Sequence, residues 1–241
     1  MYKNYIFDFY GTLADIHTDE EKRTVWEKMS LFYGYYGALY APEELKKEYK
    51  NLTAECRKRP GQNYEAHPEI RIEKVFQALF AAKGIPADEA LVLHAGQFFR
   101  VLTTEYIRLY KGVIPMLKRL RAQGKKIYLL SNAQRIFTEY ELQLLGIAGC
   151  FDGIMISSDY GVKKPDRIFF ERLLETYHLQ PQDCIMIGND AETDIAGAAG
   201  IGMDTCYIHS NLSPGYDTLV KATYILEKMN IGQLCRLLKI T

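Results

Sequence analysis

Hydrophobic and polar residues follow one another in blocks along this chain, and several short apolar runs end in polar side chains. The first run lies in Tyr5–Asp15 (YIFDFYGTLAD), where β-favouring residues lead to Asp8 and are broken at Gly11 and Thr12. This pattern predicts a buried strand that ends in a carboxylate and continues into a tight turn. Ligands of open α/β sheets bind outside the carboxyl ends of the strands, so Asp8 is expected to face a crevice. The same pattern also fits an aspartate that only caps the turn.

Three later segments repeat this arrangement: Ile127–Asn132 (IYLLSN), Gly161–Asp166 (GVKKPD) and Cys184–Asp194 (CIMIGNDAETD). From Lys111 onward, strand-like runs alternate with helical periodicity, which is typical of a parallel sheet. The expected strands are Lys126–Leu130, Gly153–Ile156, Cys184–Ile187, Thr205–Ile208 and Tyr224–Leu226. The expected helices are Pro115–Gln123, Arg135–Leu145, Pro165–Tyr177, Glu192–Gly200 and Ile231–Leu238.

Between the first strand and Lys111 the pattern is that of helices. Val25, Met29 and Phe32 are spaced by four and three residues, and we expect that helix to begin in the acidic segment 18–21. Prolines are expected to open three more helices, one after residue 41, one from residue 68 to 84 and one from residue 86 to about 110, with a loop at 57–63. An almost entirely helical insertion of this length fits a loop at the carboxyl edge of a parallel sheet.

The composition excludes several classes of protein. Thirty basic and thirty acidic residues balance among 241, so no general charge attracts nucleic acid or acidic membranes. There is no apolar run of about 18 residues that would span a membrane, and the N-terminus has no signal-peptide pattern. The five cysteines are scattered without a CxxC pair, which argues against disulfides and zinc. We therefore expect a cytoplasmic protein.

Four motifs, in order, make the chain resemble the haloacid dehalogenase superfamily of aspartate-nucleophile hydrolases. They are DxxGT at Asp8–Thr12, Ser131 after a strand, Lys164 before a proline, and the acidic pair Asp190 and Asp194. The resemblance implies a Rossmann-like, doubly wound parallel α/β core made of residues 1–15 and 110–241. It also implies a mostly helical cap domain at residues 16–109, inserted after the first motif, which would close over the nucleophile and select the substrate.

The resemblance assigns a role to each motif residue. Asp8 would be the nucleophile of a covalent mechanism, and the Lys164 ammonium would balance charge on a transferring phosphoryl group. Thr12 and Ser131 would donate hydrogen bonds to phosphoryl oxygens. By itself, Ser131 reads better as a turn residue at a strand end, and only the motif order reverses that interpretation. The residues expected to contact the substrate are Tyr10, Gly11 and Asn132.

The fourth motif predicts a magnesium site. Mg²⁺ prefers oxygen ligands, commonly one or two carboxylates with waters and substrate phosphate. By resemblance the ligands would be the carboxylates of Asp8 and Asp190 and the backbone carbonyl of Tyr10. Asp194 would bind a metal-bound water or orient Lys164, but it would equally suit the start of a helix. Asn189, a supporting residue, stands where relatives often carry an acid.

Tyr10 departs from the phosphatase pattern. Phosphatases of the superfamily usually have a second Asp two residues after the nucleophile as general acid and base, and a phenol with a pKa of about 10 does this poorly. The dehalogenase branch carries Tyr there, as DxYGT. That branch, however, works without metal and lacks an acid where Asp190 stands. It also has a halide-binding Arg where this chain has Leu39, and a Tyr where it has Phe170.

The sequence thus favours a magnesium-dependent hydrolase that cleaves a small phosphate ester through an aspartyl-phosphate at Asp8. One alternative is a metal-independent 2-haloacid dehalogenase. Another is a catalytically weak member that binds a phosphorylated metabolite or a protein. The expected partner is a small, phosphorylated molecule, with no nucleic acid and no membrane. The sequence leaves the substrate and the oligomeric state open.

Overall fold

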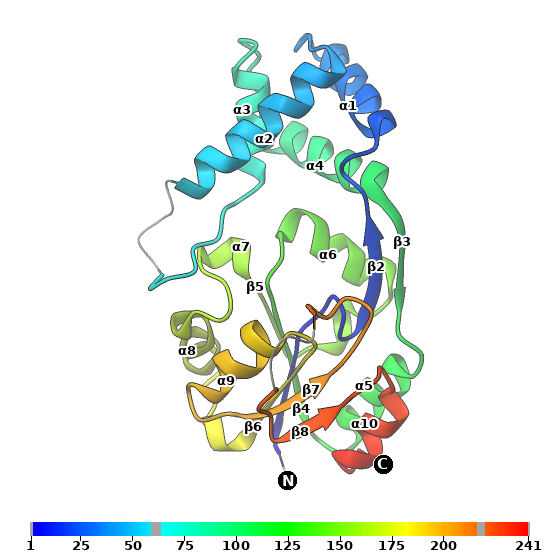
Figure 1. Ribbon diagram of the computed structural model, residues 1–241, viewed down its shortest axis with the longest axis vertical. Coiled ribbons are helices and arrows are strands. Elements are labelled where there is room, and N and C mark those ends of the chain that lie inside the picture. The colour runs from blue at the N-terminus through cyan, green and yellow to red at the C-terminus, as the bar shows by residue number, and fades with distance from the viewer. Residues whose placement is uncertain (1, 59–63, 216–219, 241) are drawn as a thin grey trace.

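The computed structural model describes residues 2–58, 64–215 and 220–240. Its centre is a six-stranded sheet in the order β5-β4-β1-β6-β7-β8, in which every neighbouring pair is parallel (Figure 1). The strands are β1 (Asn4–Phe7), β4 (Lys126–Ser131), β5 (Gly153–Ile156), β6 (Cys184–Gly188), β7 (Asp204–Ile208) and β8 (Tyr224–Leu226).

Helices cover both faces of this sheet. Tyr5 and Phe7 of β1 belong to the apolar cluster on one face, and Ile6 belongs to the cluster on the other. The first face is covered by α5 (Val113–Ala122), α6 (Arg135–Leu144) and α10 (Ile231–Leu237). The second is covered by α8 (Arg167–Thr176) and α9 (Gly197–Ala199). A parallel sheet with helices on both faces confirms the α/β fold class expected from the sequence. Burial on both faces also explains why its strands read as continuous apolar runs.

Four further helices form a separate unit, which we call the helical unit. It consists of α1 (Arg23–Tyr35), α2 (Pro42–Lys58), α3 (Glu73–Ala81) and α4 (Glu89–Thr103). Aromatic side chains such as Trp26, Phe76 and Phe99 fill its own apolar cluster. The unit lies beyond the ends of the sheet strands (Figure 1). The division into residues 1–15 with 110–241 and residues 16–109 stays a prediction.

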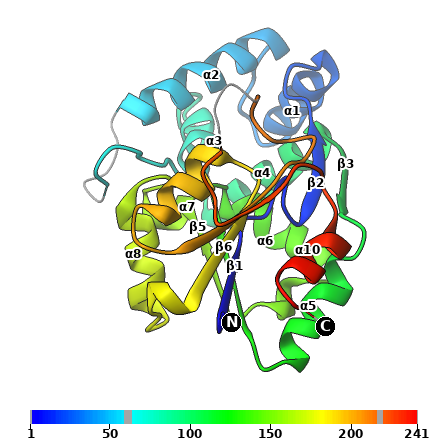
Figure 2. The ribbon, with the colours of Figure 1, turned by 60° about the horizontal axis from the view of Figure 1, so that its bottom comes forward.

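An antiparallel ribbon joins the helical unit to the sheet, where the sequence analysis expects helix. It pairs β2 (Ala14–Thr18) with β3 (Thr104–Leu109), and Ile16 lies opposite Ile107. Both views show the two strands side by side (Figure 1, Figure 2). The fourth helix therefore ends at Thr103 and not near Tyr110. The reason is that β3 pairs with β2, a segment far away in the sequence, and this pairing provides hydrogen-bond partners for the backbone N–H and C=O groups of both strands. Local periodicity does not reveal such a pairing.

Several other boundaries differ from the sequence-based prediction. The first helix begins at Arg23 rather than in segment 18–21, and the third begins at Glu73 because residues 64–72 contact the core. The predicted helix Glu192–Gly200 is instead a π-helical turn, Ala191–Ala196, followed by α9. The remaining short elements are η1 (Ala148–Cys150), α7 (Ser157–Tyr160) and η2 (Pro181–Asp183). In the predicted loop 57–63, residues 57 and 58 are the last residues of α2, and residues 59–63 lie outside the described part. Among the helices of the described ranges, none is both long and apolar enough to cross a bilayer.

Candidate active site

The strand order creates a switch point beside β1. The chain runs from β1 to β4 and β5 on one side, then returns to β6 on the other side. Ligands of doubly wound sheets bind outside the carboxyl ends of the strands at such a point. Asp8 directly follows β1, and its backbone N–H donates to the Ile187 carbonyl of β6 at 3.0 Å. Asp190 lies two residues after β6. The topology thus brings the first and fourth motifs to one edge of the sheet.

Lys164 occupies the centre of this site. Its ammonium group donates to Asp8 Oδ1 at 2.7 Å, to Asp194 Oδ1 at 2.6 Å and to the Leu130 carbonyl at 2.8 Å. The lysine is only 1% exposed. A buried cation needs charged and hydrogen-bonding partners, and these three acceptors supply them. Lys163, which precedes it, is partly exposed, and its backbone N–H donates to the His67 carbonyl at 3.0 Å.

Burial and charge act against each other in this cluster. Burial lowers the pKa of Lys164, but the carboxylates of Asp194 and Asp8 outweigh burial and raise it above its ordinary value. Burial raises the pKa of Asp194 to about 7, with the Lys164 ammonium opposing this rise and the Asp8 carboxylate adding to it. Two carboxylates therefore share one ammonium group, and Lys164 stays charged throughout the neutral pH range.

The second motif lies against the first and the third. The Ser131 hydroxyl donates to Asp8 Oδ1 at 3.4 Å. The Asn132 amide donates to the Lys164 carbonyl and accepts from the Lys164 backbone N–H, both at 2.8 Å. In this arrangement the Asn132 side chain holds the lysine backbone in place. A direct contact between Asn132 and substrate stays a prediction.

The loops of the first and fourth motifs pack tightly together. Gly11 has a φ of +85°, and a β-carbon there would clash with the Asn189 side chain. The Thr12 hydroxyl is buried and donates to Asn189 Oδ1 at 3.2 Å. Two features therefore favour glycine at position 11: the left-handed backbone conformation and the close approach of the Asn189 side chain. Thr12 and Asn189 thus hold the two loops together, and hydrogen bonds from Thr12 or Gly11 to substrate stay predictions.

The π-helical turn after β6 sets the direction of two carboxylates. Asp190 Oδ1 caps the turn by accepting from the backbone N–H groups of Glu192 and Thr193 at 2.9 and 3.0 Å. Asp194 bends back to Lys164, and its Oδ2 accepts from the Asp190 backbone N–H at 3.0 Å. A β-carbon at Gly188 would clash with the Asp194 carboxyl group. Of the two roles left open for Asp194, the structure shows it paired with Lys164.

The oxygen atoms of the predicted metal ligands suit a hard cation. Within the described residues, the second carboxylate oxygen of Asp8, that of Asp190 and the Tyr10 carbonyl accept no hydrogen bond. Among those same residues, no group of three or more His, Cys, Asp or Glu side chains is arranged so that it could hold a metal ion by itself. Two carboxylates and a carbonyl are too few for a closed all-protein site, but they suit Mg²⁺, which keeps waters and binds substrate phosphate.

The Tyr10 side chain does not hydrogen-bond to Asp8. Its hydroxyl instead donates to Glu141 and lies 2.9 Å from the Thr138 hydroxyl, both on α6. Burial raises the pKa of Tyr10, and the Glu141 carboxylate raises it further, so the phenol stays protonated. Arg100 of α4 reaches the same group from the helical unit. The Arg100–Glu141 pair was not foreseen from sequence, because the two residues come from separate elements and match no motif.

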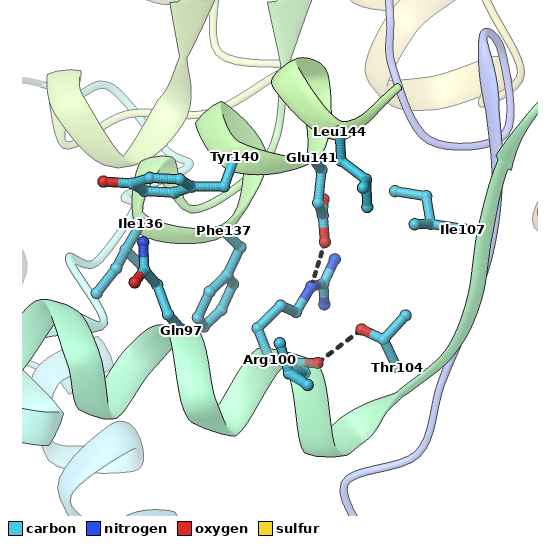
Figure 3. A pocket seen from close by; sticks show the side chains of 10 residues that line it. Gln97, Arg100, Thr104, Ile107, Ile136, Phe137, Tyr140, Glu141 and Leu144 are labelled. Carbon is cyan, nitrogen blue, oxygen red and sulfur yellow. Dashed lines mark hydrogen bonds and ion pairs between the residues drawn. The ribbon is translucent and has the colours of Figure 1, made fainter. Parts of the chain in front are cut away.

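A cavity of about 420 Å³ borders the Arg100–Glu141 pair. It lies between α4, α6 and β3, and apolar residues such as Phe137, Ile107 and Leu144 line most of it (Figure 3). Neither Asp8 nor Lys164 lines it. It is therefore distinct from the site at the strand ends.

The connection between α2 and α3 holds the lysine loop from outside. We call residues 64–72 the strap, and Pro68 in it pairs with Val162 in an isolated antiparallel bridge. Asp166 fixes its start, since Asp166 Oδ2 accepts from three successive backbone N–H groups, those of residues 65, 66 and 67, at 2.8, 2.9 and 3.1 Å. Its other oxygen caps α8 by accepting from the Ile168 N–H. In the sequence, an Asp that follows Pro165 is typical of a helix cap. The contact of Asp166 with the strap, however, is visible only in the structure.

We expect Asp166→Ala to destabilise the protein by about 2–4 kcal/mol, because it leaves several backbone N–H groups without their charged acceptor. Burial raises the pKa of Asp166, but the hydrogen bonds from residues 66, 67 and 65 outweigh it and lower the pKa. The stabilisation should therefore be full above pH 4 and be lost as pH falls through the lowered value. Urea unfolding at pH 7 and pH 3 would measure this. The control, Asp183→Ala, removes the exposed pair with Lys3 and should cost under about 1 kcal/mol at either pH.

The chain is similar in sequence and fold to several known proteins. The glyceraldehyde 3-phosphate phosphatase of Methanothermobacter thermautotrophicus is 27% identical over 165 residues, 67% of this chain and 68% of that protein. YfnB of Bacillus subtilis, named as a HAD-hydrolase, is 24% identical over 232 residues, 95% of this chain and 92% of its own. Its structure bound to magnesium has a TM-score of 0.57 at 22% identity, with 99% of each chain covered.

A structure of 2-haloacid dehalogenase from Pseudomonas syringae is also similar in fold, with a TM-score of 0.67, 22% identity and 99% of each chain covered. The family model of haloacid dehalogenase-like hydrolases matches residues 2–202, which include all four motifs. On this match, and with the motifs gathered at one sheet edge, the chain belongs to the haloacid dehalogenase-like hydrolases.

Proposed function

We propose that this hydrolase is a magnesium-dependent phosphatase that cleaves a small phosphate ester through an aspartyl-phosphate at Asp8. The observation that carries the proposal is the Lys164 ammonium, buried between Asp8 and Asp194 at the switch point of the sheet. A fixed cation beside the nucleophile suits a phosphoryl group, which develops dispersed negative charge during transfer. The glyceraldehyde 3-phosphate phosphatase described above, a relative that is 27% identical over 165 residues, supports the same reaction.

The proposed reaction has two steps at Asp8. An Asp8 carboxylate oxygen attacks phosphorus, the ester P–O bond breaks, and the alcohol leaves after taking up a proton. Water then attacks the phosphorus of the aspartyl-phosphate, which releases inorganic phosphate and restores the carboxylate. In both steps Lys164 balances charge near Asp8, and Ser131 donates a hydrogen bond from the neighbouring strand end. Because the Tyr10 hydroxyl donates its hydrogen bond to Glu141 and stays protonated, the alcohol has to obtain its proton elsewhere.

Asp8, Asp190 and the Tyr10 carbonyl would hold Mg²⁺, and the ion would add positive charge for binding and orienting the phosphate. The helical unit would act as the cap that excludes water and selects the substrate. All five cysteines are free thiols, as a reducing environment requires, and we propose a cytoplasmic location on that ground.

A 2-haloacid dehalogenase is the second candidate, and Tyr10 in the DxYGT motif favours it. Three positions oppose it. Leu39, where that branch has its halide-binding arginine, is 72% exposed and carries no charge. Phe170, where it has a tyrosine, is buried in the apolar core beneath the sheet. Asp190 stands where that metal-independent branch has no acidic residue.

The decisive experiment is a substrate panel. Phosphate esters of sugars and of aryl alcohols, and 2-chloropropionate, would each be assayed for phosphate or chloride release with magnesium and with EDTA. We expect phosphate release that requires magnesium. Chloride release that persists in EDTA would establish the dehalogenase instead. A chain that turns over neither class, yet is stabilised by phosphate esters in thermal unfolding, would be a binding protein.

We expect magnesium to stabilise the wild type but not Asp190→Ala, because a ligand that binds only the folded state adds to its stability. At 100 times its Kd the gain is about 2.7 kcal/mol, which for a chain of this size raises Tm by several degrees. Differential scanning fluorimetry with magnesium and with calcium would measure it. The control is Asp204→Ala, at the start of β7 and thus at the opposite edge of the sheet. Equal shifts in wild type and Asp190→Ala would place the ion elsewhere.

A further inference from the structure

Tyr10 connects the loop that carries Asp8 to two other elements. Its hydroxyl is bound to Glu141 and Thr138 of α6, as described above, and its ring lies 4.5 Å from that of Phe9 between centroids. Arg100 of α4 adds a third contact, with a guanidinium nitrogen 3.4 Å from the phenol oxygen. A side chain two residues from the nucleophile thus contacts both the core and the helical unit.

Arg100 and Glu141 make the contact between the two units specific. Arg100 Nε donates to Glu141 Oε1 at 2.6 Å, and the side chains are only 19% and 8% exposed. Figure 3 shows the two side chains facing each other from α4 and α6. The guanidinium also lies over the ring of Phe137, 5.1 Å from its centroid. Separating a buried ion pair leaves a charge without its partner, so the pair favours one placement of α4 on α6.

The packing around this pair is equally specific. A β-carbon on Gly96 of α4 would clash with Ile136 of α6, so the two helices approach closely there. Phe137 of α6 has its ring centroid 6.5 Å from those of Phe76 and Phe99 in the helical unit. The core helix therefore contributes side chains to the apolar cluster of the helical unit. Movement of α4 relative to α6 would disturb this packing and the ion pair together.

We propose that Tyr10 is a positioning residue, which ties the loop of the nucleophile Asp8 to helix α4 through Glu141 and Arg100. The contact gives Tyr10 a role other than the acid and base chemistry expected of an aspartate at this position. When α4 is seated on α6, the phenol is held by both helices, and the loop from Asp8 to Leu13 is held with it. When α4 moves away, the loop loses that support. The placement of the helical unit is thereby transmitted to the nucleophile.

The structural part of this proposal can be tested without turnover. Hydrogen–deuterium exchange would compare wild type with Tyr10→Phe, which keeps the ring and removes only the hydroxyl. We expect faster exchange both in residues 9–14 and in α4. The matched control is Tyr40→Phe, because the Tyr40 hydroxyl donates to the Leu79 carbonyl within the helical unit. That variant should leave residues 9–14 unchanged. If Tyr10→Phe alters only its own loop and leaves α4 as in wild type, the coupling does not exist.

The kinetic part rests on the proposed phosphatase function and uses p-nitrophenyl phosphate as the probe. Small misplacements of a reacting group cost up to about 100-fold in rate, so Tyr10→Phe should lower kcat about 10- to 100-fold with little change in KM. Arg100→Gln should act similarly, and the double variant should lose little more than the larger single loss, because both act through Glu141. Independent effects that multiply would overturn the proposal. If the wild type does not cleave the probe, the phosphatase function fails, while the exchange experiment still decides the coupling.

Discussion

Asp8→Asn is expected to abolish turnover, with a loss of kcat on the order of 10⁴- to 10⁶-fold, the range seen when an enzyme loses its nucleophile. An amide oxygen is a far weaker nucleophile than a carboxylate oxygen, and the substitution also removes one of the proposed magnesium ligands. The fold should survive, because Lys164 keeps its contacts with Asp194 and the Leu130 carbonyl. Phosphate release from an aryl phosphate, together with a thermal unfolding curve, would measure both effects.

A second aspartate provides the control for this experiment. Asp204 lies at the start of β7, at the amino end of the sheet, where its carboxylate accepts from the Tyr2 hydroxyl at 2.6 Å. Asp204→Asn makes the same chemical change far from the switch point, and its activity should stay within about twofold of wild type, as is usual for surface changes. A folded Asp8→Asn protein with substantial activity would disprove the nucleophile assignment, whichever substrate is used.

Lys164→Met is expected to have the largest effect on stability, a loss of about 3–5 kcal/mol at neutral pH, because it leaves two buried carboxylates without a cation. Methionine has a similar length and fills most of the space, so a cavity contributes little. Catalysis should also be lost, since no other ammonium group in the described part of the chain contacts Asp8. Urea unfolding in EDTA would separate the loss of stability from the binding of metal.

The stability loss should depend on pH with a definite sign. Asp194 has a pKa of about 7 in the fold, above the value of about 3.9 in an unfolded chain, and removing Lys164 raises it further. A raised carboxyl pKa favours the folded state at low pH. It costs stability as pH rises from the pKa of the unfolded chain to the pKa of the folded protein. Below pH 6 the Asp194 carboxyl is protonated in both folded proteins, so the difference between wild type and Lys164→Met should be nearly constant there and should grow as pH rises through 7 to 8. Lys163→Met is the matched control, and a flat profile or an equal loss in that variant would contradict the prediction.

The sequence determined the core of this protein largely by itself. Strands that are buried on both faces read as apolar runs, and a polar residue at the end of each run marks the edge where a parallel sheet binds ligands. Asp8 and Asp190 follow such runs, whereas Ser131 and Lys164 were selected by the order of the motifs in the resemblance to the haloacid dehalogenase superfamily. The structure brings Asp8, Ser131 and Lys164 into contact. The strand-end signals are local, because each depends only on the residues of one strand and the turn after it, whereas Lys164 lies in a loop between α7 and α8.

Only the tertiary structure decided how the helical segment joins the core. The ribbon β2–β3 and the strap form through backbone contacts between segments far apart in sequence, and such pairing leaves little trace in local periodicity. The same holds for side chains whose role depends on a distant partner. Tyr10 is read from sequence as a poor acid, and its contact with Glu141 appears only when α6 packs against the first loop. The local pattern of apolar and polar residues predicts where the strands end. The contacts between the helical unit and the core depend instead on how helices and strands pack in three dimensions.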